Sequence, residues 1–533
     1  MRRLTASLFA FAALTSAGAA HAFAGPDSVA VLANADVPES VALAKKYMAA
    51  RSIPAKYLCA LSMPVKDDIT FEDYETKVDG PFETCLKAAG IDARIEAVVV
   101  ARGVPLRVGV TTPSGVQNAA LTAVLAAWRS ADGTGAIAGQ PPGTIVDCGS
   151  PCLGAKWTNP YRNAAGPIVG GMTMAVNGVT WKPLIVTMLH GRSYDDAALL
   201  ITSAIDAEKA GGATGPFVFM DGADSARGVL DSEYPSVIAQ LKTAGFTDTQ
   251  EVPFDTAWKG PPKMASFFTG TAGLGTTIES NTFAPGALVD NLTSYGAAPQ
   301  NFAASGESQV SIARWVKVGV AGVHGTVDEP LNNCFPSRRL IVDYVTGAPL
   351  GEAYFRRLPF IYWRNLVLGD PMLAPYAKRP EVTISGFSAS VASVAQKVTV
   401  HAVDKAGSGI ETVRLYADGD LVGEAQGDTL EVCLPIKARK VELLAVAQNK
   451  VGAAALAKFP QKGWTTAAIT GDKDSSTCAT DPPPDAGTTP DPQTPPSCDG
   501  GCSCREAPSG NGASAIGLGL IAGIAILSRR RRT

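Results

Sequence analysis

The segment IEAVVVARGVPL, at residues 95–106, is the clearest sign of how the first two thirds of the chain folds. Its centre is an unbroken run of alanine and valine, and a turn containing glycine and proline follows. A strand that is apolar on both faces must be covered on both faces, as in a parallel sheet between layers of helices. This segment therefore favours an α/β fold.

Further segments of the same kind alternate with helical patterns over residues 26–378. In ESVALAKKYMAARS, residues 39–52, apolar side chains recur at helical spacing, and a helix at 196–212 closes on Gly211 and Gly212. The expected strands are SVAVLAN (28–34), PLIVTMLHG (183–191), FVFMDG (217–222), MASFFTG (264–270), VAGVHG (320–325) and NLVLGDPML (365–373). Alternation of this kind predicts a doubly wound, mostly parallel sheet, whose functional sites lie beyond the carboxyl ends of the strands.

The composition excludes some classes of function. The chain has 533 residues, enough for two or three domains, and its formal net charge is −3. Nucleic-acid binding would favour a clustered basic face, and the charge balance gives no support for one. Charged residues make up 18% of the chain, below the roughly 25% that is usual for soluble proteins.

The first 24 residues have the pattern of a secretory signal peptide. Two arginines precede an apolar run, and Ala20-His21-Ala22 provides a small-residue cleavage motif, with a second possible cut after Ala24. An apolar N-terminal helix of a cytosolic protein is the competing interpretation. Export implies an environment in which cysteines can form disulfides.

The C-terminal segment, residues 498–533, combines three features. The motif CDGGCSCREAPSG (498–510) precedes a short apolar run at 512–527, and four arginines follow at 529–532. A straight membrane helix needs roughly 20 apolar residues, so this run with its four glycines makes a weak permanent anchor. The arginines place the basic end in the cytoplasm and the cysteines on the outer side.

This arrangement resembles the MYXO-CTERM sorting tail of deltaproteobacterial surface proteins. The resemblance implies that a membrane sorting protease of the myxosortase type acts near Cys502 or Cys504. The alternatives are a plain tail anchor or a cysteine-rich metal knuckle. A knuckle would need a fourth ligand at zinc spacing, and no histidine is close.

Two further regions precede this tail. The β-rich block at about 380–460 contains short strands separated by turns such as KAGSG and ADGD, which predicts a β-sandwich. Its run DKAGSGIETVRLYADGDLVGEA resembles bacterial immunoglobulin-like domains, which implies a spacer or adhesion role. His401 lies on one of these strands and is interpreted as structural. A linker at 461–497 follows, and its proline-rich part at 481–497 is expected to be extended.

The α/β block resembles an uncharacterised family of exported bacterial proteins that co-occurs with exosortase-type sorting. The matching segments include ARGVPL, IDAEKAGG, FAPGALVDNLTSYG, GTVDEP and LGEAYFRRLPFIYWRNLVLGDPMLAPY. The resemblance covers nearly the whole block and implies no known activity.

More distantly, the order of the last segments resembles the gingipain and caspase group of cysteine peptidases, including the Gly-Asp-Pro at 369–371. That fold places a catalytic histidine in FFTGTAG (267–273), which has none, and a cysteine near LTSYG, where Ser294 stands. The thiolate and the imidazole of this chemistry are both missing. The resemblance therefore implies a degenerate caspase-like domain.

Other candidate residues lie at strand ends. His190 and His324 each end an apolar strand and precede a glycine, and Asp328 and Glu329 follow the second of them. A histidine, a carboxylate and the hydroxyl of Ser294 are the groups of a nucleophile–base–orienter set, although Ser294 lacks a glycine-flanked elbow. Each histidine alone is more often a hydrogen-bonded loop or core residue.

Two aspartates are candidates for a hard cation. Asp221 ends FVFMDG and Asp370 lies in the Gly-Asp-Pro turn, and both offer carboxylate oxygens. The competing interpretation of Asp370 is a turn cap before Pro371. No phosphate-binding loop, dinucleotide fingerprint or HExxH motif occurs, so no cofactor is expected.

The remaining cysteines suggest disulfides. Cys148 and Cys152 bracket GSP in a Gly/Pro-rich stretch and are predicted to be bridged. A CxxC redox motif has two residues between its cysteines, so the three residues between Cys148 and Cys152 argue against one. Cys59 and Cys85 are a second possible pair, although connectivity does not follow from sequence alone.

These observations leave two classes of function open. The first is an exported protein anchored at the cell surface, without catalytic activity, used for binding or envelope structure. The second is a surface hydrolase with a site near His190, His324 and Glu329. The expected partners are signal peptidase, the sorting protease and the cell envelope, and the sequence does not identify a ligand.

Overall fold

The computed structural model describes residues 24–112, 115–127, 159, 161–162, 174–176, 179–181, 184–303, 307–330, 332–360, 364–388, 391–450, 452, 459–476 and 478. The predicted signal peptide, the pair Cys148 and Cys152, the proline-rich linker and the tail with Cys502 and Cys504 lie outside these residues. Within them, no helix is both long enough and apolar enough to span a bilayer.

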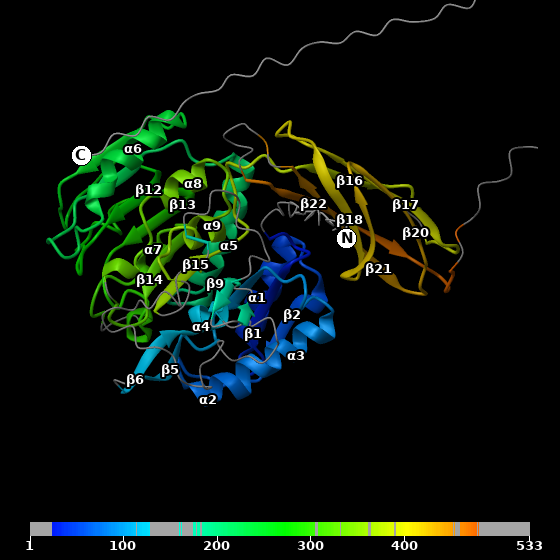
Figure 1. The fold of residues 1–533 in the computed structure, drawn as a ribbon, viewed down its shortest axis with the longest axis horizontal. Helices are drawn as coiled ribbons and strands as arrows, with labels where there is room; N and C mark the ends of the chain where they lie inside the picture. Colours follow the sequence, from blue (N-terminus) through cyan, green and yellow to red (C-terminus); the bar gives the residue numbers. More distant parts are fainter. Residues whose placement is uncertain are drawn as a thin grey trace, which may run out of the picture. The chain divides into compact units, whose positions relative to one another are not determined.

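A ten-stranded sheet organises the first part of the chain, in the order β11-β10-β12-β13-β14-β15-β9-β4-β1-β2 (Figure 1). Its strands are β1 (Val29–Asn34), β2 (Leu58–Leu61), β4 (Ala97–Ala101), β9 (Ile185–Leu189), β10 (Phe217–Met220), β11 (Thr249–Val252), β12 (Met264–Thr269), β13 (Phe283–Asn291), β14 (Gly322–Thr326) and β15 (Asn365–Gly369). Neighbours pair in parallel from β2 to β9 and from β11 to β14, whereas β14 and β15 pair antiparallel. The expectation of an α/β fold is confirmed, and its large sheet is mixed, with both parallel and antiparallel pairs.

The apolar runs of the sequence become the central strands. Every residue of β1, β4, β9, β12, β14 and β15 is buried. β9 contacts the helix α5 and also α4 and α9, as expected for a strand that is covered on both faces. The valine run of β4 is therefore at the centre of the hydrophobic core.

Helices connect the strands. They are α1 (Pro38–Arg51), α2 (Phe71–Asp73), α3 (Gly80–Ala89), α4 (Leu121–Ala127), α5 (Tyr194–Ala210), α6 (Tyr234–Thr243), α7 (Ile312–Lys317), α8 (Leu340–Val345) and α9 (Leu350–Phe355), with a π-helical segment at Tyr74–Asp79 and 3₁₀ turns at Ala55–Tyr57, Asp231–Glu233, Pro299–Phe302 and Asn332–Cys334. α5 begins in a capping box formed by Ser193 and Asp196 and ends at Gly211, whose φ is +75°.

The chain order brings several loops together at one edge of the sheet. From β1 the chain moves outward to β2 and then returns to β4 on the other side of β1. The residues after β9 meet the residues after β13, because the ring of His190 lies 4.2 Å from that of Phe302 and Arg192 pairs with Glu307. This edge carries the carboxyl ends of β4, β9 and β13.

Smaller sheets flank the main one. β3 (Asp68–Thr70), β5 (Arg107–Thr112) and β6 (Gly115–Ala120) form a three-stranded sheet, and β7 (Met174–Val176) pairs with β8 (Val179–Trp181). β5 and β6 pair antiparallel directly after the turn that follows β4. They therefore lie next to the edge at which β4 ends.

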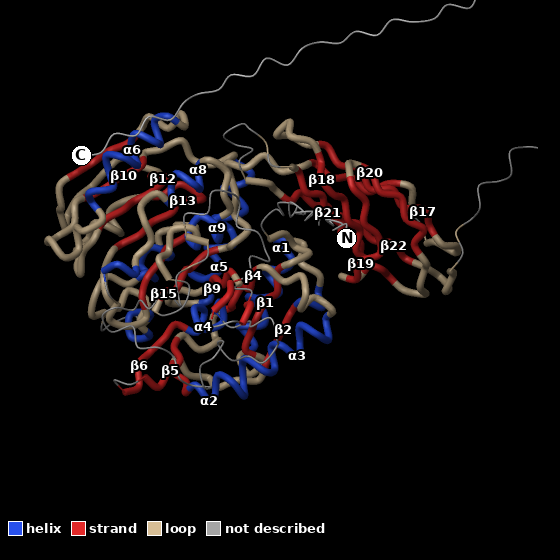
Figure 2. Tube along the Cα trace, viewed as in Figure 1, coloured by secondary structure: helices blue, strands red, loops and turns tan. Residues whose placement is uncertain are grey.

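A separate antiparallel β region follows the α/β region, and Figure 2 shows it as strands and loops. Its two sheets have the orders β16-β17-β20 and β19-β18-β21-β22. The strands are β16 (Glu381–Ser385), β17 (Gln396–Val403), β18 (Ile410–Ala417), β19 (Asp420–Gln426), β20 (Thr429–Leu434), β21 (Lys440–Asn449) and β22 (Lys462–Thr470). The region has its own hydrophobic core, which includes Val398, Val413 and Leu443.

This β region runs past its predicted end at residue 460. β22 begins at Lys462 and pairs with β21 from Lys440 to Gln448. Its sequence KGWTTAAIT has few large apolar residues, so the strand depends on backbone pairing with β21 more than on a hydrophobic pattern. Residues 462–470 thus belong to the fold and not to the linker.

Charged side chains join the α/β and β regions, which belong to one compact unit. The ammonium of Lys462 lies 3.4 Å from carboxylate oxygens of Asp27 and of Glu96, and the hydroxyl of Tyr416 donates to Asp27. Lys462 and Asp27 are both 4% exposed. Burial alone would raise the pKa of Asp27, but Lys462 and Arg414 lower it below its usual range.

Two disulfides join cysteines within the described part of the chain. Cys59 on β2 is bridged to Cys85 on α3, which was one of the pairs considered from the sequence. Cys433 on β20 is bridged to Cys478, a pair that the sequence did not indicate. Cys334 is a buried thiol.

Candidate functional site

His190 follows β9 directly and is 3% exposed. Its ring lies edge-on against Phe302, and both ring nitrogens lie 3.3 Å from Nη1 of Arg102. The same Nη1 donates to the carbonyl oxygen of Gly191. The end of β9 and the end of β4 are thus joined by one guanidinium group.

The turn after β4 holds Arg102 in place. The carbonyl oxygen of Gly103 accepts a hydrogen bond of 2.9 Å from the side-chain amide of Asn34, the last residue of β1. Gly103 has φ +99°, and a Cβ there would lie 2.9 Å from the side chains of Ser40 and Tyr194. Only glycine fits this position, because both the backbone conformation and the space exclude a side chain.

A cavity of about 260 Å³ opens beside these residues. Its lining consists of Asp67, Arg102, Gly103, His190, Tyr194, Pro299, Phe302 and Ala303. At roughly 30 Å³ per water molecule, this volume corresponds to about eight or nine waters, and a small organic molecule has a similar volume. We refer to it as the Arg102 cavity.

Burial of His190 and the charge of Arg102 set the electrostatics of the Arg102 cavity. Burial and the neighbouring Arg102 cation hold the pKa of His190 well below its usual 6.5, so the imidazole is neutral at pH 7. Burial and the adjacent Asp68 raise the pKa of Asp67. The guanidinium carbon of Arg102 lies 5.3 Å from the centre of the Tyr194 ring, a cation–π contact that orients both groups.

The position of the cavity is the one that α/β sheets use for ligands. The crevice beyond the carboxyl ends of the strands is widest where the chain changes direction in the sheet. Here that change lies between β1 and β4, because β2 lies on one side of β1 and β4 on the other. Asn34 and Gly103 mark this point, and Arg102 extends from it to His190.

The groups around this cavity are suited to binding. Arg102 bonds to a backbone carbonyl through Nη1, and its Nε and Nη2 have no hydrogen bond to any described residue. Guanidinium groups recognise carboxylates and other oxyanions through such pairs of N–H donors. A general base works best when its pKa is near the working pH, and the pKa of His190 lies well below its usual value.

His324, in contrast, lies inside the core on β14 and is 0% exposed. Its Nδ1 lies 3.0 Å from Oδ1 of Asp290, and its Nε2 lies 3.0 Å from Oδ1 of Asn365. Arg338 pairs with the other oxygen of Asp290 and donates to the carbonyl oxygen of Thr269 at 2.7 Å. Both ring nitrogens of His324 are therefore engaged within a buried network.

Ser294 and Glu329 meet elsewhere on the surface. The hydroxyl of Ser294 donates to Oε1 of Glu329 at 2.6 Å, and Glu329 is exposed. Asp328 instead accepts a hydrogen bond of 2.9 Å from Asn118. Of the groups that the sequence suggested for a catalytic set, the structure brings together Ser294 and Glu329. The ring nitrogens of His324 contact other residues.

The two aspartates considered for a cation have different surroundings. Asp370 accepts hydrogen bonds from the hydroxyl of Tyr47 at 2.7 Å and the amide of Met372 at 2.9 Å, and it pairs with Arg51. The backbone of Asp221 bonds to Val252 and Thr269. Among the described residues, no group of three or more His, Cys, Asp or Glu side chains is placed to hold a metal ion.

Sequence reasoning missed Arg102, Asp67 and Tyr194. Arg102 was present in the segment ARGVPL, directly after a fully apolar strand, at the place where α/β folds position functional groups. That position was the available signal. Asp67 and Tyr194 come from other loops and meet Arg102 only in the folded chain.

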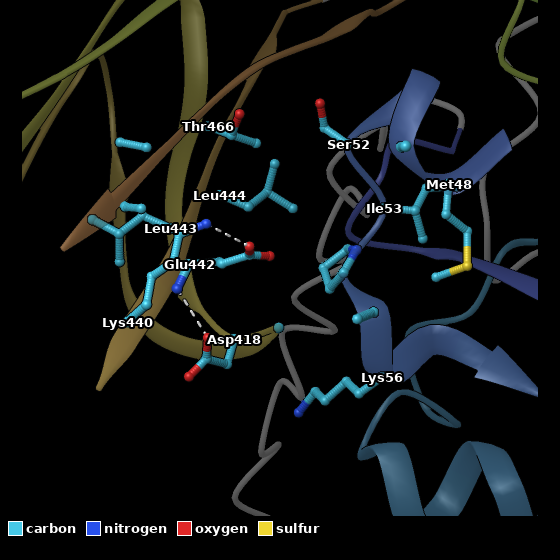
Figure 3. Close-up of a pocket in the computed structure, with 16 residues that line it drawn as sticks. Met48, Ser52, Ile53, Lys56, Asp418, Lys440, Glu442, Leu443, Leu444 and Thr466 are labelled. Carbon is cyan, nitrogen blue, oxygen red and sulfur yellow. Dashed lines mark hydrogen bonds and ion pairs between the residues drawn. The ribbon is translucent and has the colours of Figure 1, made fainter. Parts of the chain in front are cut away.

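A larger cavity, of about 600 Å³, lies where the end of α1 faces β21 and β22 (Figure 3). Met48 and Ile53 form one wall, and Leu444 and Thr466 form the other. The charges at its rim pair with one another or with nearby residues: Lys440 with Glu442, and Lys56 with Asp420. This cavity lies at the junction of the α/β and β regions. Its described lining residues do not form a converging set of polar groups.

No family model matches the chain, and no curated protein matches it. Fibronectin(III)-like modules of Clostridium thermocellum CbhA are 13% identical over 21% of this chain and 53% of theirs, with a TM-score of 0.14. The Clostridium perfringens spore cortex lytic enzyme SleM is 10% identical over 54% of this chain and 78% of its own, with a TM-score of 0.13. The chain spans about half the length of the first of these, and likeness at this level carries no argument about function.

Proposed function

We propose that this chain is an exported, surface-anchored protein that binds a small organic acid in the Arg102 cavity and does not catalyse a reaction. The observation that carries the proposal is the convergence of Arg102, His190 and Tyr194 on an open cavity at the carboxyl ends of β4 and β9. Small, mostly preformed cavities with a few oriented polar groups are typical of ligand sites.

Two lines of support favour export. The N-terminal pattern is that of a signal peptide, and the tail resembles a cut-and-sort signal. The bridges Cys59–Cys85 and Cys433–Cys478 need an oxidising compartment to persist. In this proposal a myxosortase-like protease processes the chain near Cys502 or Cys504 and leaves the folded regions at the cell surface.

The finer fold belongs to the same proposal. We interpret the α/β region as a degenerate caspase-like or gingipain-like domain, with Ser294 after β13 where such peptidases carry their cysteine. The β region is an immunoglobulin-like spacer. Its two antiparallel sheets around one core support this interpretation.

Binding is favoured over hydrolysis by the protonation and contacts of the histidines. His190 is neutral and a weak base because of burial and Arg102, and no serine, threonine or cysteine occurs among the described residues that line its cavity. His324 is buried against Asp290 and Asn365. In a nucleophile–base pair the histidine ring contacts the nucleophile, and the contacts of these two rings are with other groups.

The chemistry of the cavity selects the ligand class. Arg102 pairs with a carboxylate through its Nε and Nη2 donors. Asp67 and Tyr194 offer a carboxyl group and a hydroxyl group for a second polar group of the ligand, and Phe302 and Pro299 contact its carbon atoms. A hydroxy acid or amino acid of a few carbon atoms meets all of these requirements.

The test is thermal unfolding of the mature chain with acetate, lactate, succinate and glutamate as probes. We expect at least one hydroxy or amino acid to raise the unfolding temperature of the wild type and to lose this effect in Arg102→Gln. Arg439→Gln, an exposed arginine of the β region, is the matched control and should keep the effect. The same rise in both variants, or no rise in the wild type, would reject the binding proposal.

Processing of the tail is tested independently. The mass of the envelope-bound wild-type protein should correspond to cleavage near the cysteine motif. Changing Cys502 and Cys504 together to alanine should leave the tail uncut and the protein in the inner membrane. A double variant that reaches the surface with a normal mature mass would make a plain tail anchor the better explanation.

A further inference from the structure

A second polar cavity, of about 540 Å³, lies beside the first turn of α6. Three arginines line it, Arg162, Arg339 and Arg357, together with the serine hydroxyls of Ser236 and Ser337. We call it the arginine groove. It shares no lining residue with the Arg102 cavity.

The arginine groove has an excess of positive charge. The described residues of its lining include three arginines and a single acid, Glu233. Arg162 and Arg339 are both exposed, and neither forms an ion pair with any described residue. Arg357 pairs with Asp343 through two hydrogen bonds, of 2.5 and 2.9 Å, which hold its guanidinium in a fixed orientation.

The one acid of the groove is already engaged in its wall. Oε2 of Glu233 accepts hydrogen bonds from the hydroxyl of Ser337 at 2.6 Å and from the amide of Arg338 at 2.7 Å. These two donors partly offset its negative charge. Arg162 and Arg339 therefore keep a field that attracts anions.

The orientation of α6 adds to this field. Glu233 is the N-cap of α6 and makes no capping hydrogen bond with its side chain, and Ser236 lies in the first turn. The N-terminal end of a helix of this length carries a partial positive charge, which stabilises an anion close to it. The helix dipole and the arginines thus act in the same direction.

We infer that the arginine groove binds a small polyanion with two or more carboxylate or phosphate groups. Planar guanidinium groups pair with both kinds of oxyanion, and the hydroxyl of Ser236 supplies a further donor. Arg162 and Arg339 supply two cations that no described residue pairs, so a ligand with two or more negative charges uses the site best. The size of the groove admits a ligand larger than the Arg102 cavity does.

The test is calorimetric titration of the mature chain with pyrophosphate and, separately, with propane-1,2,3-tricarboxylate. We expect millimolar or tighter binding of at least one of them, and weaker binding as the salt concentration rises, because exposed charges are screened. The probe that binds more tightly distinguishes a phosphate ligand from a carboxylate ligand, and either result supports the inference.

Variants assign the binding to the groove. Arg339→Gln should weaken binding about tenfold, and Arg162→Gln combined with Arg339→Gln should weaken it further. Both side chains are exposed, so the unfolding temperature should stay close to that of the wild type. Arg439→Gln is the matched control and should bind as the wild type does.

Three results would overturn the inference. One is the absence of any binding of either probe at millimolar concentration. A second is an equal loss of affinity in Arg439→Gln and in Arg339→Gln, since this would show only a general effect of net charge. Loss of affinity in Arg102→Gln alone would place the polyanion in the other cavity and reject the groove as its site.

Discussion

The buried ionic networks of the α/β region and the Arg102 cavity use the same kinds of side chain with opposite results. In one network, Asp290 lies between Arg338 and His324, and all three side chains are 0% exposed. In another, Arg51 lies between Asp370 and Glu208. The Arg102 cavity also has an arginine, a histidine and an aspartate, but they face an open volume.

This contrast shows that a stabilising cluster differs from a binding site in how its charged side chains are paired, and not in residue type. A buried charge whose partner is fixed contributes to the folded state, and removal of that partner is costly. In the Arg102 cavity the guanidinium keeps donors that no described residue accepts. A ligand supplies the missing partner, so these residues should matter less for stability and more for binding.

The largest expected effect is in the Asp290 network. Asp290→Asn keeps the shape of the side chain but leaves the buried Arg338 cation without its counter-charge. We expect a loss of about 3–5 kcal/mol in the free energy of unfolding, measured by urea denaturation with the disulfides intact. Asp224→Asn, at an exposed surface pair with Arg227, is the control and should not change the unfolding midpoint. If Asp290→Asn lost as little free energy of unfolding as the control does, the stabilising role of the buried network would be contradicted.

The second effect is pH-dependent and centres on Glu208. Burial alone would raise its pKa, but Arg51 and Arg379 lower it to about 2. Because the pKa is lower in the folded state, this stabilisation is present at pH values above about 4.5 and is lost as the pH falls towards 2. The shift corresponds to about 3 kcal/mol at neutral pH.

Glu208→Gln should therefore lower the free energy of unfolding at pH 7, and its difference from the wild type should shrink as the pH falls to 3. The control is Glu83→Gln. The two carboxylates are similarly exposed, 21% and 22%, but Glu83 pairs only with Lys87 on the same helix. We expect a change of about 0.5 kcal/mol or less for the control. A difference for Glu208→Gln that does not vary with pH would argue against the role of the two arginines.

A smaller effect is expected for His190. Its pKa is lower in the folded state than in the unfolded state because of burial and Arg102. The neutral ring is thus compatible with folding above about pH 6.5, and stability is lost as the pH falls below that value. His190→Gln should reduce the slope of stability against pH between 6.5 and 4 by up to about 1.4 kcal/mol per pH unit. Identical slopes in the two proteins would show that the ring is charged or exposed.

The smallest effect is expected at the surface pair of Ser294 and Glu329. Ser294→Ala removes one partly exposed hydrogen bond and should change the free energy of unfolding by about 0.5 kcal/mol or less. Binding of small acids in the thermal-shift assay should remain. Hydrolysis of a peptide or ester substrate by the wild type that disappears in Ser294→Ala would instead favour the hydrolase alternative.

The strands of the sheet could be predicted because their signal is local. AVVVA is apolar throughout and IVTML is apolar except for Thr187, and each forms a buried strand of the mixed sheet. β22 could not be predicted in this way, because KGWTTAAIT follows no strong pattern and pairs through its backbone with β21. The pairing of Cys433 with Cys478 also depends on that strand, which brings the last described residues back to β20.

The two histidines show why the site was harder to predict than the fold. His190 and His324 both end an apolar strand and precede a glycine, so the sequence treats them alike. Their partners come from distant segments: Arg102 stands 88 residues before His190, and Asp290 and Asn365 lie 34 and 41 residues from His324. Only the folded chain distinguishes a ring beside a cavity from a ring inside the core.

The bridge between Cys433 and Cys478 has a mechanical consequence. A pulling force applied to the chain beyond residue 478 passes through the covalent bond to β20, and it does not peel β22 away from β21 strand by strand. The two cysteines stand 45 residues apart, and the chain between them is thereby withheld from extension, a hidden length of roughly 150 Å at about 3.4 Å per residue. Reduction of this bond would release that length and convert a stiff tether into a long, compliant one.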